Sequence, residues 1–573
     1  MRKSKLIALC LALTMIMSTV SAFGCTGLYI GKDVSADGST IVGRSEDQGR
    51  GFYNKRFEVQ PRVKEKGRYY VDEGEEQEGF KVALPETTYK YTYVPDSSDL
   101  GDGEYPGTCT NEYGLVVVGT ISASPSEAYL AEDPYVHPGL REAILPGLIA
   151  CQAKTARGAA KTLAKLTDKY GSEEGNILFF VDQKEAWIFE SYGGHTYAAM
   201  KMPKDKVAVF GNQFMIDVVD KDDTENYIFS KNLFETIDKV GAVMEDGKYN
   251  LVKSISDPVR EEYSNMRTWM GHKILSPSTV GEYSDYEFYP LFYTPDEKVE
   301  VETVMDIFRN RYEGTPYDMM LPENESRRPI GVTRSSMVHI LQTFDNLPKD
   351  SCSIQWLSTG NAEHNVFIPA FSGITDTHEA YKPDGSETYN PKSMYSATKR
   401  ICGIAESDRE FLGQGVKDYW KLQEKMMIKQ TKKDMKKINS AYKEGKEEGR
   451  EAATEISMKY ADKQFKNSEK LFNDLLWCQI NNVNDRPDNE RKEQFVANTN
   501  LKEYAKFKGY EIKQNKKGTK YSFEKKGVKY TITVDSPVCK VEKDGKTEEI
   551  ELTRAPYISG KTLYAPVDFV KTL

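Results

Sequence analysis

The sequence has few of the residues and spacings that mark most hydrolases and redox enzymes. Only 6 histidines occur in 573 residues, and no HExxH, GxSxG or GxGxxG pattern is present. These absences argue against a zinc protease, a serine hydrolase with a nucleophile elbow and a dinucleotide-binding enzyme. The 8 cysteines are widely and irregularly spaced, without a CxxC pair or a zinc-binding pattern. We therefore expect no disulfide framework.

Long apolar runs are also absent after the first 20 residues, so no later segment is expected to span a membrane. The formal net charge is −9, which disfavours nucleic acid as the main partner because phosphate binding needs clustered Lys and Arg. Charged residues make up 29% and apolar residues 39%, a balance typical of a soluble globular protein. The length is too great for one core and indicates roughly three to four domain-sized units.

The amino-terminal residues 1–24 read as a signal peptide. A basic start is followed by an apolar stretch from Leu6 to Val20, and Ala22-Phe23-Gly24 forms a small-x-small cleavage site. We therefore expect a bacterial protein that is secreted or held at the cell surface. An uncleaved anchor fits less well because the run is short for a span, and a lipoprotein fits less well because Ala22 and Phe23 suit a lipobox poorly.

Alternating and β-branched segments follow the cleavage site. A strand, a DVSADG turn and a second strand are predicted between Cys25 and Arg44, and a buried strand at Gly114–Ser122. Asn176–Asp182 and Ala186–Gly194 predict a hairpin, and Lys206–Gln213 another strand. Helical patterns run from about Gly139 to Leu166. The chain is therefore α+β without regular βαβ alternation.

The composition changes towards the carboxyl end. Residues 408–482 are rich in Lys and Glu at helical spacing and predict charged helices that pack one face on the main body at 25–407. No clean heptad persists, so a coiled coil for a partner is the weaker interpretation. A linker is predicted at about Asn481–Arg491. The last unit, residues 483–573, is predicted to comprise this linker and a small β-rich module.

Cys25 would become the first residue of the mature chain if cleavage follows Gly24. Its thiol has an ordinary pKa of about 8.5 and its α-amine one of about 7.7–8.0, so the partly neutral amine can take the thiol proton during attack on a carbonyl. The same residue then supplies nucleophile and base, and no histidine is required. Arg44 and Asp47 lie where the hairpin returns; Arg44 would stabilise the thiolate and Asp47 would bind the α-amine. Elsewhere such an RxxD pattern is more often a surface ion pair.

The segment CTGLYIGKDVSADGSTIVGRSED resembles the amino end of the bacterial cysteine dipeptidases, which are N-terminal-nucleophile (Ntn) hydrolases related to secernins, penicillin V acylase and bile salt hydrolase. The resemblance continues through NEYGLVVVGT, NILFFVDQKEAWIFES, VFGNQF and NMRTWMGHKIL. It implies an oxyanion-binding backbone amide near Thr120 or Ile121, an oxyanion-binding side chain at Asn212 and a further active-site arginine at Arg267. Asn212 could instead be a turn residue and Arg267 a structural ion pair; Asn111 is interpreted as a turn residue.

This resemblance implies the four-layer αββα sandwich of Ntn hydrolases and hydrolysis of dipeptides through a thioester, without cofactor or metal. One alternative keeps the chemistry and changes the substrate to N-acyl amino acids. Another, of a different class, is a non-catalytic cell-surface binding protein. A homo-oligomer is also possible from the sequence.

The carboxyl-terminal tail resembles a second module, the copper amine oxidase N-terminal-like domain of secreted bacterial proteins. The matching residues are Ala555-Pro556-Tyr557-Ile558, Gly560-Lys561-Thr562-Leu563-Tyr564, Pro566 and Val570. No copper site is found in this segment. The resemblance implies attachment to the cell envelope.

Overall fold

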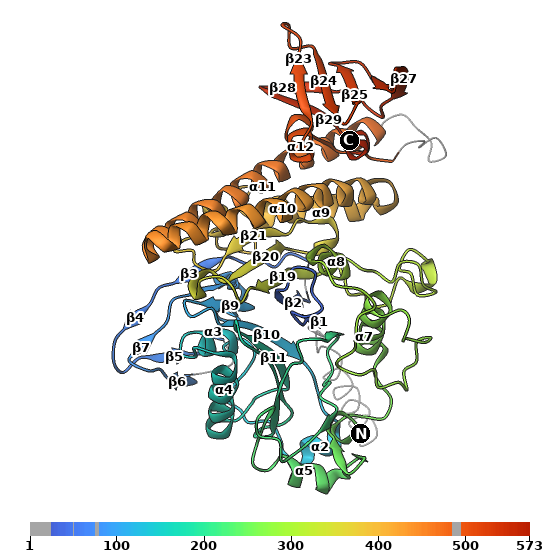
Figure 1. The fold of residues 1–573 in the computed structure, drawn as a ribbon. Helices are drawn as coiled ribbons and strands as arrows, with labels where there is room; N and C mark the ends of the chain where they lie inside the picture. The colour runs from blue at the N-terminus through green and yellow to red at the C-terminus, as the bar shows by residue number, and fades with distance from the viewer. Residues whose placement is uncertain (1–23, 50, 75–78, 484–493) are drawn as a thin grey trace, which may run out of the picture.

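The computed structural model describes residues 24–573 except 50, 75–78 and 484–493 (Figure 1). The signal peptide predicted at 1–24 therefore lies outside the described residues apart from Gly24, and so does most of the predicted linker. Within this described part, no helix is both long and apolar enough to cross a bilayer.

Two antiparallel sheets form the centre of the molecule. The six-stranded sheet has the order β14-β1-β2-β19-β20-β21. Its strands are β14 Val207–Phe210, β1 Gly24–Ile30, β2 Thr40–Asp47, β19 Ser335–Thr343, β20 Ser353–Thr359 and β21 Ile368–Phe371. The eight-stranded sheet has the order β16-β13-β12-β11-β10-β9-β8-β3. Its strands are β16 Tyr227–Phe229, β13 Tyr197–Lys201, β12 Ala186–Ser191, β11 Asn176–Val181, β10 Val116–Ser122, β9 Thr108–Asn111, β8 Tyr91–Tyr93 and β3 Glu58–Gln60.

The period-two alternation of β1 decides what each face of its sheet contacts. Cys25 and Tyr29 belong to the buried cluster between the two sheets, together with Val118 and Phe179 of the other sheet. Leu28 and Ile30 point the opposite way, into a cluster shared with the helices. Gly27 lets the sheets approach closely beside Cys25, because a Cβ there would lie 2.4 Å from Ile121 Cδ1.

Helices cover the outer faces of both sheets. Helices α3 (Leu145–Ala150) and α4 (Ala156–Tyr170) lie on the eight-stranded sheet, and their apolar residues form a separate buried cluster with it. Helices α7 (Glu262–Leu275), α8 (Val301–Ile307) and α9 (Met394–Ser407) lie on the six-stranded sheet. The order helix, sheet, sheet, helix confirms the αββα sandwich (Figure 1).

The hairpins predicted from the sequence are confirmed. β1 pairs with β2 in a register that sets Cys25 opposite Glu46, and β11 pairs with β12. The helical pattern from Gly139 to Leu166 is divided into two helices. The second begins where the Thr155 hydroxyl accepts a hydrogen bond from Gly158 N and caps its first turn.

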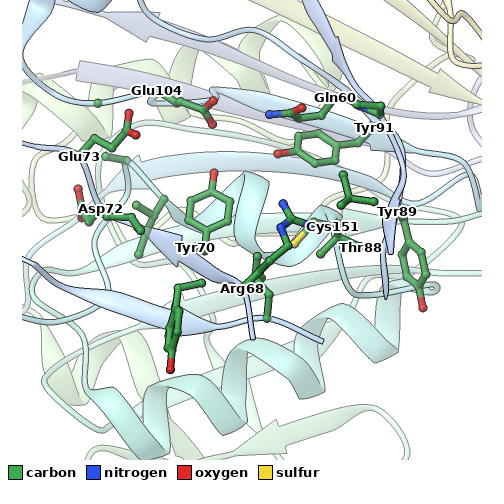
Figure 2. Close-up of a pocket in the computed structure, with 18 of the residues that line it drawn as sticks. Gln60, Arg68, Tyr70, Asp72, Glu73, Thr88, Tyr89, Tyr91, Glu104 and Cys151 are labelled. Atoms are coloured by element: carbon green, nitrogen blue, oxygen red, sulfur yellow. Dashed lines mark hydrogen bonds between the residues drawn. The ribbon is translucent and has the colours of Figure 1, made fainter. Parts of the chain in front are cut away.

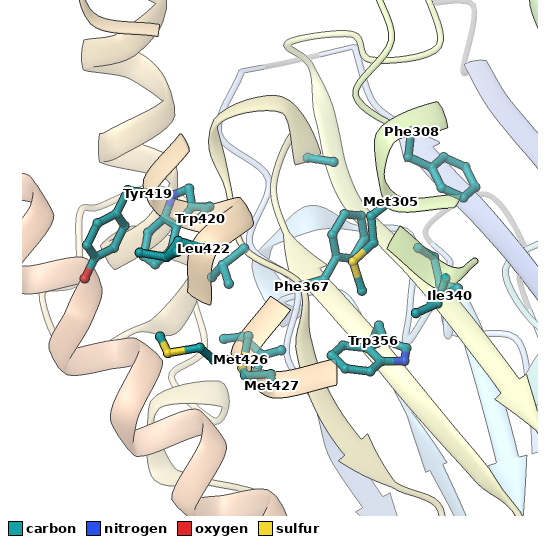
Figure 3. Packing of buried hydrophobic residues seen from close by; sticks show 14 of the residues in the cluster. Met305, Phe308, Ile340, Trp356, Phe367, Tyr419, Trp420, Leu422, Met426 and Met427 are labelled. Carbon is teal, nitrogen blue, oxygen red and sulfur yellow. The ribbon is translucent and has the colours of Figure 1, made fainter. Parts of the chain in front are cut away.

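Two long helices follow the sandwich. α10 (Gln414–Glu444) and α11 (Lys446–Val483) lie side by side across the six-stranded sheet (Figure 1). Trp420, Met426 and Met427 of α10 belong to the same buried cluster as Trp356 and Phe367 of the sheet region (Figure 3). The charged residues lie mainly on the other faces of the helices, which is the amphipathic arrangement expected for helices that pack on a body.

The carboxyl-terminal part forms a small β-rich unit beyond these helices (Figure 1). It contains a five-stranded sheet and a three-stranded sheet. Its elements are β22 Asn498–Asn500, α12 Leu501–Lys508, β23 Glu511–Gln514, β24 Lys520–Lys525, β25 Val528–Thr533, β26 Val538–Lys543, β27 Lys546–Glu551, β28 Tyr557–Ser559, β29 Thr562–Pro566 and α13 Val567–Thr572. It is joined to the helices by hydrogen bonds such as Gln423 Nε2 to Thr499 Oγ1, 3.1 Å long. The domain boundaries and the envelope-attachment role remain predictions.

Short elements occupy the periphery. They are β4 Val63–Lys64, β5 Tyr69–Val71, β6 Lys81–Ala83, β7 Thr87–Thr88, β15 Val218–Val219, β17 Met244–Glu245, β18 Lys248–Asn250, α2 Glu127–Glu132, α5 Leu233–Val240 and α6 Leu251–Ile255. Cys25, Cys109, Cys151, Cys352, Cys402 and Cys539 are free thiols, and all six are buried.

Candidate active site

Cys25 lies at the start of a central strand, between β14 and β2. Its side chain is almost completely buried, with Gly24 still attached on its amino side. Arg44 Nη2 donates a hydrogen bond to Cys25 Sγ over 3.2 Å, and the Cys25 backbone nitrogen donates to Asn212 Oδ1 over 2.9 Å. The sulfur and the nitrogen of this residue are thus each held by a different, specific partner.

Arg44 belongs to a buried chain of alternating charges. Its Nη1 donates to Glu46 Oε2 over 2.7 Å, Glu46 Oε1 lies 2.9 Å from Lys55 Nζ, and Lys55 also pairs with Asp96. Burial alone would raise the pKa of Glu46, but Lys55 and Arg44 outweigh it and lower that pKa. Because all four side chains are buried, Arg44 does not belong to a surface ion pair, the more common setting of an RxxD pattern. The chain fixes the guanidinium against the sulfur.

The thiol of Cys25 is a weak acid in this environment. Burial raises its pKa to about 11, although Arg44 acts in the opposite direction. The nearby carboxylates of Asp47, Glu142 and Glu46 contribute to the rise. At neutral pH the sulfur is therefore a thiol, and it needs a neighbouring base before it can act as a nucleophile.

Asn212 and Arg267 hold the backbone of Cys25 from the side of α7. Arg267 Nη1 donates to Cys25 O over 2.6 Å, and its Nη2 donates to Asn212 Oδ1 over 2.8 Å. Asn212 Nδ2 donates to Ser122 O of β10 over 2.9 Å. Burial and the neighbouring Arg328 lower the pKa of Arg267 to about 10. The amide oxygen of Asn212 thus faces the Cys25 nitrogen, while its NH₂ group points towards β10.

Asp47 is close to Cys25 but has other partners. In the strand register it lies opposite Gly24, and its carboxylate accepts hydrogen bonds from Arg328 Nη2 and the Ser335 hydroxyl. The described contact of the Cys25 nitrogen is with Asn212, so the assignment of Asp47 to the freed α-amine remains a prediction. Gly24 lies close to the arginine that binds Asp47: a Cβ on Gly24 would lie 3.0 Å from Arg328 Nη2.

Thr120 and Ile121 lie on β10, on the other side of the inter-sheet space. The register of β10 with β11 shifts between Val118 and Ile121, so Thr120 has no opposite residue in that ladder. Such an irregularity frees a backbone amide from the sheet. The Thr120 and Ser122 hydroxyls both donate to Glu142 Oε2, over 2.8 and 2.9 Å. The role of these backbone amides in binding an oxyanion remains a prediction.

A cavity of about 590 Å³ begins next to these residues. Its wall includes Ser122, Asn212 and Tyr263, and the carboxylates of Glu142 and Glu174. A separate cavity of about 200 Å³, lined by residues that include Tyr70, Glu104 and Cys151, lies under the peripheral strands (Figure 2). This second cavity contains none of the predicted site residues. The first cavity is within the size range of small-ligand sites.

Among the described residues, one group of three side chains has the geometry to hold a metal ion: Glu363, His364 and Glu406. Its carboxylates are already bound by cations. Glu363 pairs with Arg409, Arg311 and Lys417, and Glu406 pairs with Arg311 and Arg409. These positive charges would oppose a metal cation, so the group is better explained as a buried ion network.

Sequence reasoning located Cys25, Arg44, Asp47, Asn212 and Arg267, and the fold brings these five together. It missed Glu46, Lys55 and Arg328, and the two carboxylates of the cavity wall. Asn111, interpreted as a turn residue, is confirmed as one: its Oδ1 accepts hydrogen bonds from Tyr113 N and Leu115 N.

The fold and the position of Cys25 define the class: an αββα hydrolase fold with a cysteine at the start of a central strand. The family model for peptidase family C69 matches residues 24–422, and the chain belongs to this family. "Probable dipeptidase B" of Streptococcus pyogenes serotype M1 is 32% identical over 461 residues, covering 78% of this chain and 91% of that protein. "Dipeptidase A" of Lactobacillus helveticus is 27% identical over 400 residues, covering 68% of this chain and 83% of that protein. The crystal structure of a mutant conjugated bile acid hydrolase from Clostridium perfringens covers 64% of this chain and 98% of its own, with 11% identity and a TM-score of 0.25.

Proposed function

We propose that the protein is a bacterial cysteine dipeptidase in which Cys25, freed as the first residue, supplies both nucleophile and base. Membership of peptidase family C69 and relatives named as dipeptidases support this activity. The mechanism is inferred mainly from two contacts of Cys25. Arg44 donates a hydrogen bond to its sulfur, and its backbone nitrogen donates one to Asn212.

The first half of the reaction forms a thioester. The Cys25 sulfur attacks the carbonyl carbon of the dipeptide while the Cys25 α-amine accepts the thiol proton. Arg44 stabilises negative charge on the sulfur as the proton leaves. The tetrahedral oxyanion is held by Asn212 Nδ2, which has a second N–H besides the one donated to Ser122 O, and by a backbone amide at Thr120 or Ile121.

The intermediate then collapses. The C–N bond breaks, the proton held by the Cys25 ammonium passes to the leaving nitrogen, and the carboxyl-terminal amino acid departs. Water attacks the thioester carbonyl with the neutral α-amine as base, which releases the first amino acid as a carboxylic acid and restores the thiol. Burial raises the pKa of the Cys25 thiol, which supports a role for a neighbouring base in taking its proton. Arg267 acts through Asn212 and the Cys25 carbonyl, which it positions.

A direct assay tests the proposal. The mature protein is given Ala-Ala, Gly-Leu and a set of N-acyl amino acids, and release of free amino acid is measured. Faster hydrolysis of the dipeptides supports the dipeptidase, whereas exclusive turnover of N-acyl amino acids supports the amidase or acylase alternative. No turnover of either class, with Cys25→Ala behaving like the parent, supports a non-catalytic surface protein and refutes the proposal.

Secretion through a cleaved signal peptide at 1–24, a location outside the cell or at its surface, and envelope attachment through residues 483–573 are parts of the same proposal. The basic, apolar and small-x-small order of the first 24 residues supports the first two. Association of several copies into a homo-oligomer also remains a proposal, which size-exclusion chromatography of the secreted protein would test.

A further inference from the structure

The wall of the 590 Å³ cavity carries two carboxylates that the mechanism above does not use. Glu142 is 8% exposed, and its backbone N–H donates to Glu174 Oε1 over 2.7 Å. In the described part of the chain, no Lys, Arg or His nitrogen forms an ion pair with either carboxylate, since the neighbouring Arg141 pairs with Asp72 instead. Arg141 acts on Glu174 and Arg44 on Glu142 only without direct ion pairs, so the two adjacent carboxylates remain costly, and a cation between them would relieve that cost.

Glu142 is attached to the predicted oxyanion region itself. Its Oε2 accepts the hydroxyls of Thr120 and Ser122, while Ser122 O accepts the amide of Asn212. Its charge also reaches the reacting sulfur, because it is among the carboxylates that raise the pKa of Cys25. A cation bound at Glu142 would therefore lie beside the predicted oxyanion region.

A third group of the same cavity wall is an unsatisfied acceptor. Gln213 is buried, its Nε2 donates to Asn265 Oδ1 and Thr268 Oγ1, and its Oε1 accepts no hydrogen bond from the described residues. A buried acceptor without a donor normally costs free energy, and a ligand that donates N–H groups would satisfy it. Gln213 also borders a neighbouring cavity of about 120 Å³, and independently of the acidic pair it is an unsatisfied acceptor that an N–H donor of a ligand would satisfy.

The substrate proposed above is a dipeptide. Its α-nitrogen lies only about 2.5 Å from the carbonyl carbon of the same residue, given ordinary bond lengths and angles. An ammonium group must therefore lie next to the oxyanion region whenever the carbonyl lies over Cys25. We propose that Glu142 and Glu174 bind the α-ammonium group of the substrate and so select free dipeptides over N-acylated amino acids. This inference rests on the proposed dipeptidase function.

Burial and the adjacent Glu142 raise the pKa of Glu174 above its ordinary value. Glu174 therefore retains its proton to a higher pH than an exposed glutamate does. The pair then carries less than two negative charges near neutral pH, which suits a ligand with a single positive charge.

The test uses two substrates that differ only at the ammonium group. Ala-Ala and N-propionyl-alanine have the same heavy-atom skeleton apart from the amino group. For the wild-type protein we expect kcat/KM to be at least 10-fold higher for Ala-Ala. Glu142→Gln, which keeps the shape and removes the charge, should lower kcat/KM for Ala-Ala by about 10- to 100-fold, the usual effect of a lost hydrogen bond to a charged group. Because Glu142 also contacts Thr120 and Ser122, the value for N-propionyl-alanine can fall too, but it should fall less, so that the ratio of the two kcat/KM values drops by about 10-fold or more.

Glu174→Gln is a second test variant, in which kcat/KM for Ala-Ala should also fall, but by less than in Glu142→Gln. Asp257→Asn is the matched control. Asp257 is an exposed carboxylate at the edge of the same cavity, and its removal should change kcat/KM for Ala-Ala less than about threefold, as surface charges usually do. If the wild type cleaves N-propionyl-alanine as well as Ala-Ala, the inference is refuted without any variant. The same holds if folded Glu142→Gln and Glu174→Gln both keep the wild-type substrate ratio. If neither substrate is cleaved, it is the proposed function that fails.

Discussion

Replacement of Arg44 gives the sharpest test of how the site activates Cys25. Arg44→Met keeps an unbranched apolar stem and removes the guanidinium that donates to Cys25 Sγ over 3.2 Å. Arg44 is completely buried, so its charge is weakly screened at the sulfur. The thiolate loses its closest positive charge, and the pKa of the thiol must rise further.

The size of this rise can be estimated from the distance. Two unit charges 3.2 Å apart interact by about 5 kcal/mol at an effective dielectric constant of about 20. Relaxation and water entry into the vacated space reduce this to about 3 kcal/mol, which corresponds to about 2 pKa units. Glu46 keeps its 2.9 Å contact with Lys55, so the loss of folding stability should be at the lower end of the roughly 3–5 kcal/mol typical of a broken buried pair.

The assay is the pH dependence of Cys25 alkylation by iodoacetamide, followed by peptide mass spectrometry. At a fixed pH below both midpoints, Arg44→Met should be alkylated about 100-fold more slowly, because each pKa unit removes about 90% of the thiolate. Arg44→Lys should be intermediate, since it keeps the charge but lacks the planar fork. Arg62→Met, which removes a half-exposed arginine paired with Glu112, is the control and should match the wild type. A folded Arg44→Met protein with an unchanged alkylation profile would refute this account of activation.

Four further outcomes are expected. Cys25→Ala should abolish release of alanine from Ala-Ala while the thermal unfolding curve is retained, and turnover above about 1% of wild type would contradict the nucleophile assignment. Asn212→Ala should lower kcat by about 10²–10³, as loss of an oxyanion donor does, whereas Asn111→Ala should mainly lower Tm. In wild type, kcat/KM should rise with pH through the pKa of the α-amine, near 8, and acetylation of that amine should abolish the activity. Glu174 has a raised pKa in the folded state, so its contribution to stability is present at pH 4 and is lost as pH rises. The Tm of Glu174→Gln should therefore exceed that of wild type by an amount that grows from pH 5 to pH 8.

Much of the sandwich could be predicted because its strands carry local signals. The alternation in β1 and the turn residues before Thr40 define a hairpin, and this hairpin returns Arg44 beside Cys25. The division of the helical segment between Gly139 and Leu166 was not predicted. The break covers residues 151–155, and the Thr155 hydroxyl that caps α4 is a weak local signal beside the apolar periodicity around it.

The site was predictable where its residues share one strand and unpredictable where partners come from distant loops. Arg44 and Glu46 form a direct ion pair on one face of β2, while Ser45 and Asp47 form a contact of their own. Successive side chains of a strand point to opposite faces of the sheet. Asp47 therefore lies on the face opposite Arg44 and does not contact the Cys25 sulfur. The orientation of the Asn212 amide depends on Arg267 of α7 and Ser122 of β10, which no local pattern relates to it. Glu142 and Glu174 lie outside every recognisable motif, so the acidic cavity wall had no sequence signal.

The residue before Cys25 can distinguish the two ways in which residues 1–24 could be removed. A Cβ on Gly24 would lie 2.2 Å from the Tyr263 hydroxyl, which accepts a hydrogen bond from Arg334 Nη2, so Gly24→Ala cannot fit the folded precursor without displacing that ring. Signal peptidase accepts alanine at this position as readily as glycine, and it cuts before the chain folds. Because the first 24 residues have the order of a signal peptide, we expect Gly24→Ala to be processed normally and to give a mature protein identical to wild type.

The contrary result would have an equally definite meaning. If cleavage takes place within the folded chain, Gly24→Ala should accumulate as a longer precursor, because the start of β1 is displaced from Asn212 and Arg44. Tyr263→Phe should then restore processing in the double variant by removing the clashing oxygen. Amino-terminal sequencing and intact mass of the secreted proteins measure both outcomes. A Gly24→Ala precursor that Tyr263→Phe rescues would show that the active site itself, and not signal peptidase, exposes the Cys25 amine.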